Sequence, residues 1–300
     1  MASSAIRTAA AAASSVAVAL LLAGAGPTGT QARSHPAGSQ SRGTTEFGSF
    51  PMIRAGTGPA ASAGPGTPDI TSAASLNWAG YAVTKAHLRF SGVRATFFVP
   101  YLNCAKSPGS ALSSDWVGLD GFTGRADSVE QGGIAANCLA SGKATYFAWW
   151  ELFPGAQQKT TLRVSAGDSV TASVTYSAQS RNFKILIADN TNGRHFSVQR
   201  KCPHVEVAGK LLSCARNSAE IISEAPATGP KLRIARLADY GAISFDAISI
   251  TDSRGAKGGI VSPHWNATKI IQLRDSGGAT LARPTPTALR TFDIYWLRED

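Results

Sequence analysis

From Ser75 to the C-terminus, short runs rich in β-branched and aromatic residues are separated by Gly, Pro, Asn or Asp. No window of eleven or more residues holds a convincing 3.6-residue period. Short strands at close spacing predict an all-β sandwich. We expect strands at Val93–Val99, Asp115–Leu119, Thr145–Phe153, Thr161–Val164, Ser169–Tyr176, Phe183–Ala188, His195–Gln199, Ala219–Glu224, Lys231–Ala235, Ile243–Thr251, Lys269–Leu273 and Phe292–Trp296.

The N-terminal part of the chain lacks this pattern. Arg7 and the Ala/Leu-rich run at residues 8–25 are typical of a signal peptide, which we place at residues 1–32. Residues 33–73 are rich in Gly, Pro, Ser, Ala and Thr, and we interpret them as a disordered linker or pro-segment. Their composition leaves open whether they form a passive tether or an inhibitory pro-segment. We expect the β-sandwich domain to span residues 74–300.

Hydropathy and charge bear on whether the protein binds a membrane or a nucleic acid. No later stretch reaches the roughly 18 apolar residues that a transmembrane helix needs. We therefore expect a secreted, extracellular protein without a membrane contact after signal removal. The net charge is +10, but the basic residues are dispersed and form no aromatic-interleaved stripe, so we expect no nucleic-acid partner.

The chain has four cysteines, and an even count in an exported protein favours disulfides. Four cysteines allow three connectivities. We favour Cys104–Cys138 and Cys202–Cys214, because the second pair closes a short loop between adjacent strands. No C-x-x-C and no Cys/His cluster occurs at metal spacing, so we expect no metal site.

Several familiar catalytic signatures are missing from the sequence. There is no H-E-x-x-H, no G-x-S-x-G, no Walker loop and no dinucleotide fingerprint. Arg274–Gly278 resembles the nucleophile segment of trypsin-like serine proteases, but the Ala-Ala-His-Cys signature of that family is absent. We expect no nucleophilic side chain, metal or cofactor to carry the chemistry.

Clusters of Trp, Gly and acidic residues stand out instead. They are Ser75–Tyr81 (SLNWAGY), Asp115–Gly121 (DWVGLDG), Glu130–Gly133 (EQGG), Tyr146–Pro154 (YFAWWELFP), Asn217–Glu224 (NSAEIISE) and Ala238–Phe245 (ADYGAISF). In this order they resemble the eqolisins, the glutamic peptidase family. That family carries N-W-x-G, W-V-G-x-D-G, Q-x-G, Y-x-A-W-x-E-x-x-P, A-E-x-x-x-E and D-x-G-x-x-x-F along the chain.

The resemblance implies a concanavalin-like, two-sheet antiparallel jelly roll with a Gln and a Glu as catalytic pair on its concave face. The matching residues are Gln131 and Glu224, with Glu224 taken as the base because it fills the second Glu of the motif. Glu220 is the alternative, since Glu220, Ile222 and Glu224 point to one face of a strand.

The resemblance also implies supporting residues beside the substrate. These are Trp116, Asp120, Glu151, Trp78 and Gly80. Core packing is an equal alternative for Trp78 and for Trp149. Asp120 is expected to orient the catalytic amide.

A carboxylate and an amide suffice for peptide hydrolysis, since the carboxylate takes a proton from water and the amide donates to the developing oxyanion. We therefore expect a monomeric endopeptidase that acts on polypeptides at acidic pH. Two departures from fungal members bear on this: Phe147 replaces an acidic residue, and a basic chain lowers carboxyl pKa values. The alternative is a non-catalytic carbohydrate- or peptide-binding sandwich.

Overall fold

Strands make up most of the computed structural model. It describes residues 47–48, 50–55, 70–107, 109–123, 128–207, 210–228, 233–276 and 278–298. The expected signal peptide lies outside these residues, as does most of the expected linker. Three parts of that linker are described: strand β1 at residues 47–48, residues 50–55, and the beginning of strand β2 at Ile70.

The strands follow one another with one short 3-10 turn, η1 (Cys104–Lys106), among the described residues. The longer strands are β2 (Ile70–Ser75), β3 (Trp78–Thr84), β4 (Phe90–Phe98), β5 (Ala111–Leu119), β6 (Val129–Cys138), β7 (Ala144–Phe153), β9 (Ser169–Ser177), β10 (Asn182–Asp189), β11 (Arg194–Lys201), β14 (Ser218–Glu224), β17 (Ala242–Asp252), β19 (Asn266–Leu273), β20 (Thr280–Pro284) and β21 (Phe292–Trp296). The two-residue strands are β1 (Phe47–Gly48), β8 (Gln158–Lys159), β12 (Glu206–Val207), β13 (Lys210–Leu211), β15 (Ala227–Thr228), β16 (Arg233–Ile234) and β18 (Lys257–Gly258).

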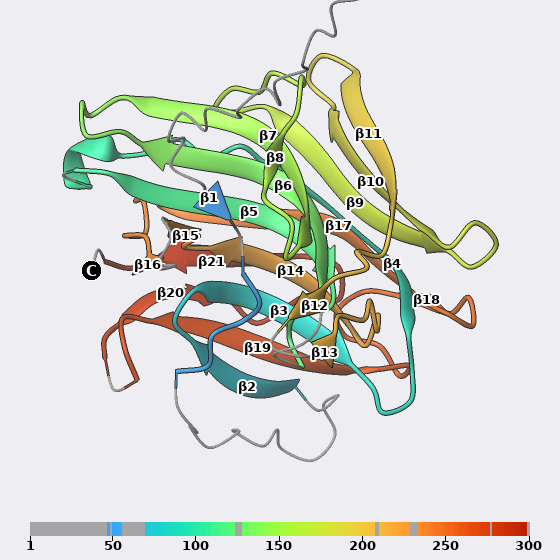
Figure 1. Cartoon of the computed structure of the whole chain (residues 1–300). Coiled ribbons are helices and arrows are strands. Elements are labelled where there is room, and N and C mark those ends of the chain that lie inside the picture. Colours follow the sequence, from blue (N-terminus) through green and yellow to red (C-terminus); the bar gives the residue numbers. More distant parts are fainter. Residues whose placement is uncertain are drawn as a thin grey trace, which may run out of the picture. The chain divides into compact units, whose positions relative to one another are not determined.

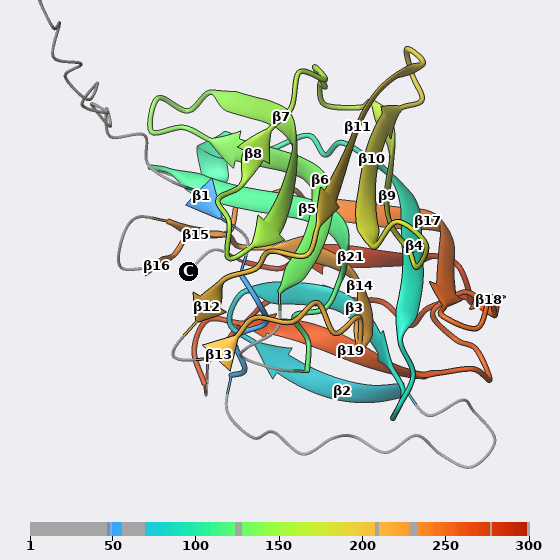
Figure 2. The ribbon, with the colours of Figure 1, turned by 45° about the vertical axis from the view of Figure 1, so that its right-hand side comes forward.

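One large sheet runs in the order β11-β10-β9-β4-β17-β21-β20-β19-β3-β14-β5-β6-β7-β8. Its pairs are antiparallel, except that β2 joins β19 in parallel. The sheet folds back on itself, so that β4 and β9 lie against β5, and β9 and β10 lie against β6 (Figures 1 and 2). The result is a two-layer sandwich, as the sequence predicted.

The main core lies between the two layers. On β5, Val117 and Leu119 point into this core, together with Ile134 of β6 and Ile221 of β14. Because side chains alternate along a strand, the intervening residues of these strands point to the opposite face. A second apolar cluster on that face contains Trp78, Trp116 and Trp149. We call this surface the tryptophan face; it is formed by β3, β14, β5, β6 and β7.

Most of the predicted strands are present, with ends that differ by a few residues. The strand expected at Thr161–Val164 is wrong: Leu162 and Val164 are buried in the core, but the segment has no strand pairing. The expected strand at Lys231–Ala235 is reduced to β16, and residues 231–232 lie outside the described part. Among the longer strands, the sequence analysis missed β2, β3, β6 and β20, and β2 begins within the segment that was expected to be a disordered linker.

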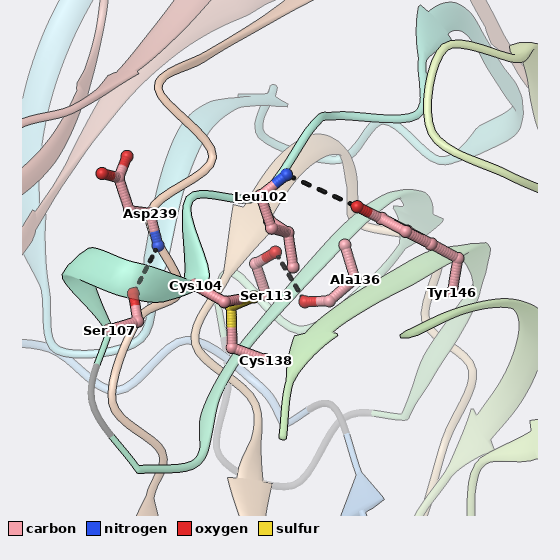
Figure 3. Close-up of a disulfide and its surroundings, with 8 residues drawn as sticks. All are labelled: Leu102, Cys104, Ser107, Ser113, Ala136, Cys138, Tyr146 and Asp239. Carbon is pink, nitrogen blue, oxygen red and sulfur yellow. Dashed lines mark hydrogen bonds between the residues drawn. A yellow bond between two sulfur atoms is a disulfide. The ribbon is translucent and has the colours of Figure 1, made fainter. Parts of the chain in front are cut away.

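Both expected disulfides are confirmed. Cys104–Cys138 joins η1 to the end of β6, and Cys202–Cys214 links two cysteines that are 12 positions apart in the sequence. Around the first bond, the Leu102 N–H donates to the Tyr146 hydroxyl and the Asp239 N–H donates to Ser107 Oγ (Figure 3). This disulfide therefore anchors the loop after β4 to the sheet that carries the tryptophan face.

Candidate active site

Four residues form one row across neighbouring strands of the tryptophan face. Glu220 of β14 pairs with Gly118 of β5, and Gly118 pairs in turn with Gln131 of β6. Gln131 pairs with Glu151 of β7. Direct cross-strand partners share a face of the sheet, so the two carboxyl groups and the amide project to the same side.

Gly118 leaves the space between Glu220 and Gln131 free of a side chain. A Cβ atom at this position would lie 2.8 Å from the Trp116 ring and 3.2 Å from Gln131 Cβ. Both distances are shorter than ordinary van der Waals contact. A larger residue at 118 would therefore displace either the indole or the amide.

Glu151 of β7 binds the Gln131 side chain from the side opposite to Gly118. Gln131 Nε2 donates to Glu151 Oε2 at 3.3 Å, and both residues are buried. An ionised carboxylate only accepts hydrogen bonds, so the NH₂ end of the amide must face Glu151. The buried Gln131 Oε1 accepts no hydrogen bond from any described residue. The amide is therefore held by one hydrogen bond, which its own NH₂ group donates, and its oxygen is available to a further partner.

Glu224 lies further along β14, in a different set of contacts. Trp116 Nε1 donates to Glu224 Oε2 at 2.9 Å. Asn77 Nδ2 and the Phe50 N–H both donate to Glu224 Oε1, each at 3.1 Å. Glu224 is thus a buried acceptor bound by three donors, one of which comes from the segment before the domain.

The separation along the strand distinguishes the two glutamates. Glu220 and Gln131 are two strands apart in one row, which is about 10 Å between backbones at ordinary strand spacing. Glu224 lies four residues beyond Glu220, which adds about 13 Å along the strand. In this register the backbone of Gln131 is nearer to that of Glu220 than to that of Glu224.

The tryptophans occupy the middle of this face. Trp78 and Trp116 meet edge to face with ring centroids 5.0 Å apart, and both are fully buried. Trp149 belongs to the same cluster. Gly80 has φ +144°, and a Cβ there would lie 2.2 Å from the Ile221 carbonyl oxygen. Gly80 thus permits the close approach of β3 to β14 and offers no side chain to a substrate.

Asp120 directly follows β5 with φ +69°, and it accepts hydrogen bonds from the backbone N–H groups of Arg216 and Asn217 at 2.7 and 2.8 Å. It also acts on Glu130, whose side chain points away from the tryptophan face. Burial and the charge of Asp120 raise the pKa of Glu130 well above its usual range, although the Ser128 hydroxyl donates to it. Asp120 therefore fixes the loop before β14.

The sequence model of the Peptidase A4 family matches residues 76–289. The chain belongs to this family, the eqolisins. Its fold is similar to scytalido-glutamic peptidase with a transition state analog inhibitor (TM-score 0.59, 24% identity, covering 74% of this chain and 98% of that one). It is also similar to SCP-B, an eqolisin in a complex with the tripeptide Ala-Ile-His (0.56, 23%, 74% and 98%).

A third similar structure is aspergilloglutamic peptidase from Aspergillus niger (TM-score 0.50, 23% identity, covering 62% of this chain and 99% of that one). No curated protein matches the chain significantly. The eqolisin family membership makes this protein a glutamic-type endopeptidase, a hydrolase whose substrates are polypeptides. Among the described residues, no helix is long and apolar enough to cross a membrane.

Motif residues of β3, β5, β6, β7 and β14 thus lie on one face, among them Glu220, Glu224, Gln131, Glu151 and the tryptophans, whereas Phe245 of the last motif is buried in the main core. Sequence reasoning missed the role of Asn77, which binds Glu224 from the turn before β3. A signal was present, because Asn77 is the first residue of the N-W-x-G motif. It also missed Phe50, and low-complexity sequence around that residue gave no such signal.

Proposed function

We propose that this eqolisin hydrolyses peptide bonds with Gln131, Glu220 and a water molecule. The observation that carries the proposal is the row Glu220–Gly118–Gln131–Glu151, in which an amide and a carboxyl group share one face across a glycine. No cofactor is needed for this chemistry.

Each group has one role. The Glu220 carboxylate takes a proton from water as the water attacks the scissile carbonyl, and it later returns the proton to the leaving nitrogen. An amide NH₂ has two hydrogens. One hydrogen of Gln131 binds Glu151, and the other donates to the tetrahedral oxyanion. The free Gln131 Oε1 orients the attacking water.

The choice of Glu220 revises the expectation from sequence. The motif favoured Glu224 as base and left Glu220 as the alternative. The register supports Glu220, because it lies in the same row as Gln131, whereas Glu224 is bound by Trp116 and Asn77. We assign Glu224 to substrate binding. Trp116 and Trp78 line the same face, and Asp120 supports it from the adjoining loop.

The proposed chemistry bears on the pH optimum of the enzyme, and the disulfides bear on the compartment in which it acts. A carboxyl group that both takes and returns a proton operates best near the ordinary carboxyl pKa range, so we propose an acidic optimum. Two disulfides support secretion to an oxidising compartment. We retain the division into a signal peptide at residues 1–32, a linker or pro-segment at residues 33–73 and a domain at residues 74–300, with a monomer as the acting form.

The test is hydrolysis of a denatured protein from pH 2 to pH 8. Each protein would be assayed as purified and after cutting at a foreign protease site placed within residues 56–69. Glu220→Gln, Glu224→Gln and Gln131→Ala would be compared, with folding checked by circular dichroism. We expect Glu220→Gln and Gln131→Ala to abolish turnover and Glu224→Gln mainly to raise KM. Full turnover by Glu220→Gln together with none by Glu224→Gln would return the base to Glu224.

A further inference from the structure

A lysine lies at the margin of the tryptophan face. Lys159 of β8 is the direct cross-strand partner of Trp149 of β7, so its side chain projects to the same side of the sheet. Strand β8 ends the strand order of the large sheet, beside β7 (Figures 1 and 2). Lys159 is exposed, whereas Trp149 is fully buried within the face. The lysine therefore lies between the buried part of the face and solvent.

The ammonium group of this lysine contacts an aromatic ring and no carboxyl group. Lys159 Nζ lies 5.1 Å from the centroid of the Phe147 ring, which is half-buried, and a cation is attracted to the face of such a ring. Within the part of the chain that the structure describes, Lys159 has no ion-pair partner. Phe147 and Glu151 lie on opposite sides of Trp149 along β7, so the lysine is directed away from the Glu151 carboxyl group. Its charge is therefore available to a ligand.

A buried hydroxyl group lies two strands away from this pair. Phe147 pairs with Ala135 of β6, and Ala135 pairs with Ser114 of β5, so the three share one row of the face. Only the methyl group of Ala135 lies between Phe147 and Ser114 in this row. Ser114 is fully buried, and its Oγ has no hydrogen-bond partner among the described residues. Because an unpaired buried hydroxyl is unfavourable, this position favours a ligand that brings a polar group.

The charges around this corner of the face favour an anion beside Lys159. Glu224 is the cross-strand partner of Ser114, and its backbone lies three strands from Phe147, which is about 14 Å at ordinary strand spacing. In one medium, the attraction of an anion to an ammonium group at about 4 Å is roughly three times its repulsion by a carboxylate at about 14 Å. The net charge of +10 adds a long-range attraction for acidic substrates.

We propose that Lys159, Phe147 and Ser114 form a subsite that accepts an acidic side chain of the polypeptide substrate. This inference rests on the proposed function, and it names a substrate class for the same site. The Lys159 ammonium binds the substrate carboxylate, the Phe147 ring packs against its methylene groups, and the Ser114 hydroxyl donates a hydrogen bond to it. Ala135 is four residues from Gln131 on β6, which is about 13 Å. The acidic residue therefore lies within about four extended residues of the scissile bond.

Charge reversal at two lysines tests the subsite. Lys159→Glu changes the lysine of the subsite, and Lys184→Glu makes the same change in net charge at an exposed position of β10, in the opposite layer. A quenched peptide that the parent protein cuts at one bond would carry a single Glu, or a Gln in its place, at each position within four residues of that bond. Values of kcat/KM would be measured at pH 3 and pH 6, for each protein as purified and after cutting within residues 56–69.

At pH 6 we expect the parent protein to prefer Glu to Gln about fivefold at one position, as an ion pair at an exposed lysine allows. The preference should vanish at pH 3, because a glutamate side chain with an ordinary pKa of about 4.3 is then protonated. Lys159→Glu should reverse the preference at pH 6, Ser114→Ala should reduce it, and Lys184→Glu should retain it. Fluorescence anisotropy of the labelled peptides with Gln131→Ala measures binding without turnover and should show the same preference.

Equal kcat/KM values for the Glu and Gln peptides at every position would overturn the subsite and leave the peptidase proposal intact. An equal loss of preference in Lys159→Glu and Lys184→Glu would assign the preference to the overall charge of the protein, and it would also overturn the subsite. Absence of hydrolysis by every protein would refute the peptidase chemistry. The anisotropy measurement would then decide the subsite alone, and equal binding of the Glu and Gln peptides would overturn it.

Discussion

Glu220 of β14 and Gln131 of β6 occupy the same cross-strand row, and the residue between them is Gly118 of β5. This relationship requires β14, which is distant in sequence, to pair in register with the consecutive strands β5 and β6. A slip of one residue in β14 would turn Glu220 towards the core, and a slip of one residue in β6 would do the same to Gln131. The register is therefore as important to the proposed chemistry as the identity of the residues.

The short distances around Gly118 predict that Gly118→Ala strongly lowers kcat. The new Cβ would lie 2.8 Å from the Trp116 ring and 3.2 Å from Gln131 Cβ, so the amide must move. A displacement of about 1 Å at a reacting group costs on the order of 100-fold in rate. We expect kcat to fall by about 10- to 100-fold, together with a loss of about 1–3 kcal/mol in the free energy of unfolding from overpacking.

Gly92→Ala is the matched control for this variant. Its Cβ would meet its nearest neighbour, Thr175, at 3.5 Å, which is ordinary contact. We expect an unchanged kcat and a stability equal to or slightly above that of the parent protein. Steady-state kinetics and urea unfolding of both variants measure these effects. Normal turnover by Gly118→Ala would show that catalysis does not need the space that Gly118 leaves between Glu220 and Gln131.

The Gln131–Glu151 hydrogen bond predicts a positioning role for Glu151. Glu151→Ala removes the acceptor for Gln131 Nε2, and hydrogen bonds to charged groups contribute about 1.5–3 kcal/mol. We expect kcat to fall by roughly 10- to 100-fold with little change in KM, because a freely rotating amide no longer points its second hydrogen at the oxyanion. Glu151→Gln keeps an acceptor oxygen and should recover most of kcat.

The comparison of kcat and KM separates this role from a structural one. A merely structural Glu151 would lower the amount of folded enzyme in both variants and leave kcat per folded molecule unchanged. Circular dichroism and active-site titration by a tight inhibitor would provide that correction. An equal loss in Glu151→Ala and Glu151→Gln would argue against the hydrogen bond as the cause.

Much of the fold was predictable because alternation along single strands is a local property. The pattern correctly put Glu220, Ile222 and Glu224 on one face of β14. Which glutamate lies in the row of Gln131 depends on how β14, β5 and β6 pair, and a single sequence does not encode that register. The motif position alone favoured the more distant residue.

Strand β6 was missed for a related reason. Its sequence contains Gly132 and Gly133, and glycine is depleted in strands. The structure shows why glycine is required: a Cβ on Gly133 would lie 2.0 Å from the Asp115 carbonyl oxygen, and one on Gly132 would lie 2.5 Å from Ile185. Close packing between strands and layers overrides local propensity here.

Two tryptophans allow the assignment of Glu224 to substrate binding to be tested. Trp116→Phe keeps an aromatic ring but removes the Nε1 donor to Glu224 Oε2. We expect KM for peptides to rise about tenfold, the equivalent of about 1.4 kcal/mol, with kcat nearly unchanged. Trp149→Phe is the control, because its buried Nε1 has no partner among the described residues. Similar KM values for the two variants would exclude a role for the Trp116 donor.

The burial of Asp115 predicts that the folded protein is more stable at acidic pH than at neutral pH. Its side chain is buried between the layers beside Ser223 and Tyr240, and burial raises its pKa from 3.8 to about 7, with partial opposition from Ser223. A folded-state pKa above the unfolded value contributes stability that is fully present below about pH 4 and is lost as pH rises through 7. The loss amounts to at most about 4 kcal/mol.

Asp115→Asn removes this titration while keeping the size of the side chain. We expect the variant and the parent protein to unfold at similar urea concentrations at pH 4, and the variant to be the more stable at pH 8. Parallel stability curves for Asp115→Asn and the parent protein would show that Asp115 stays ionised in the fold. A falling curve for the parent protein alone would mean that burial of Asp115 makes the fold most stable at the acidic pH that we propose for the reaction.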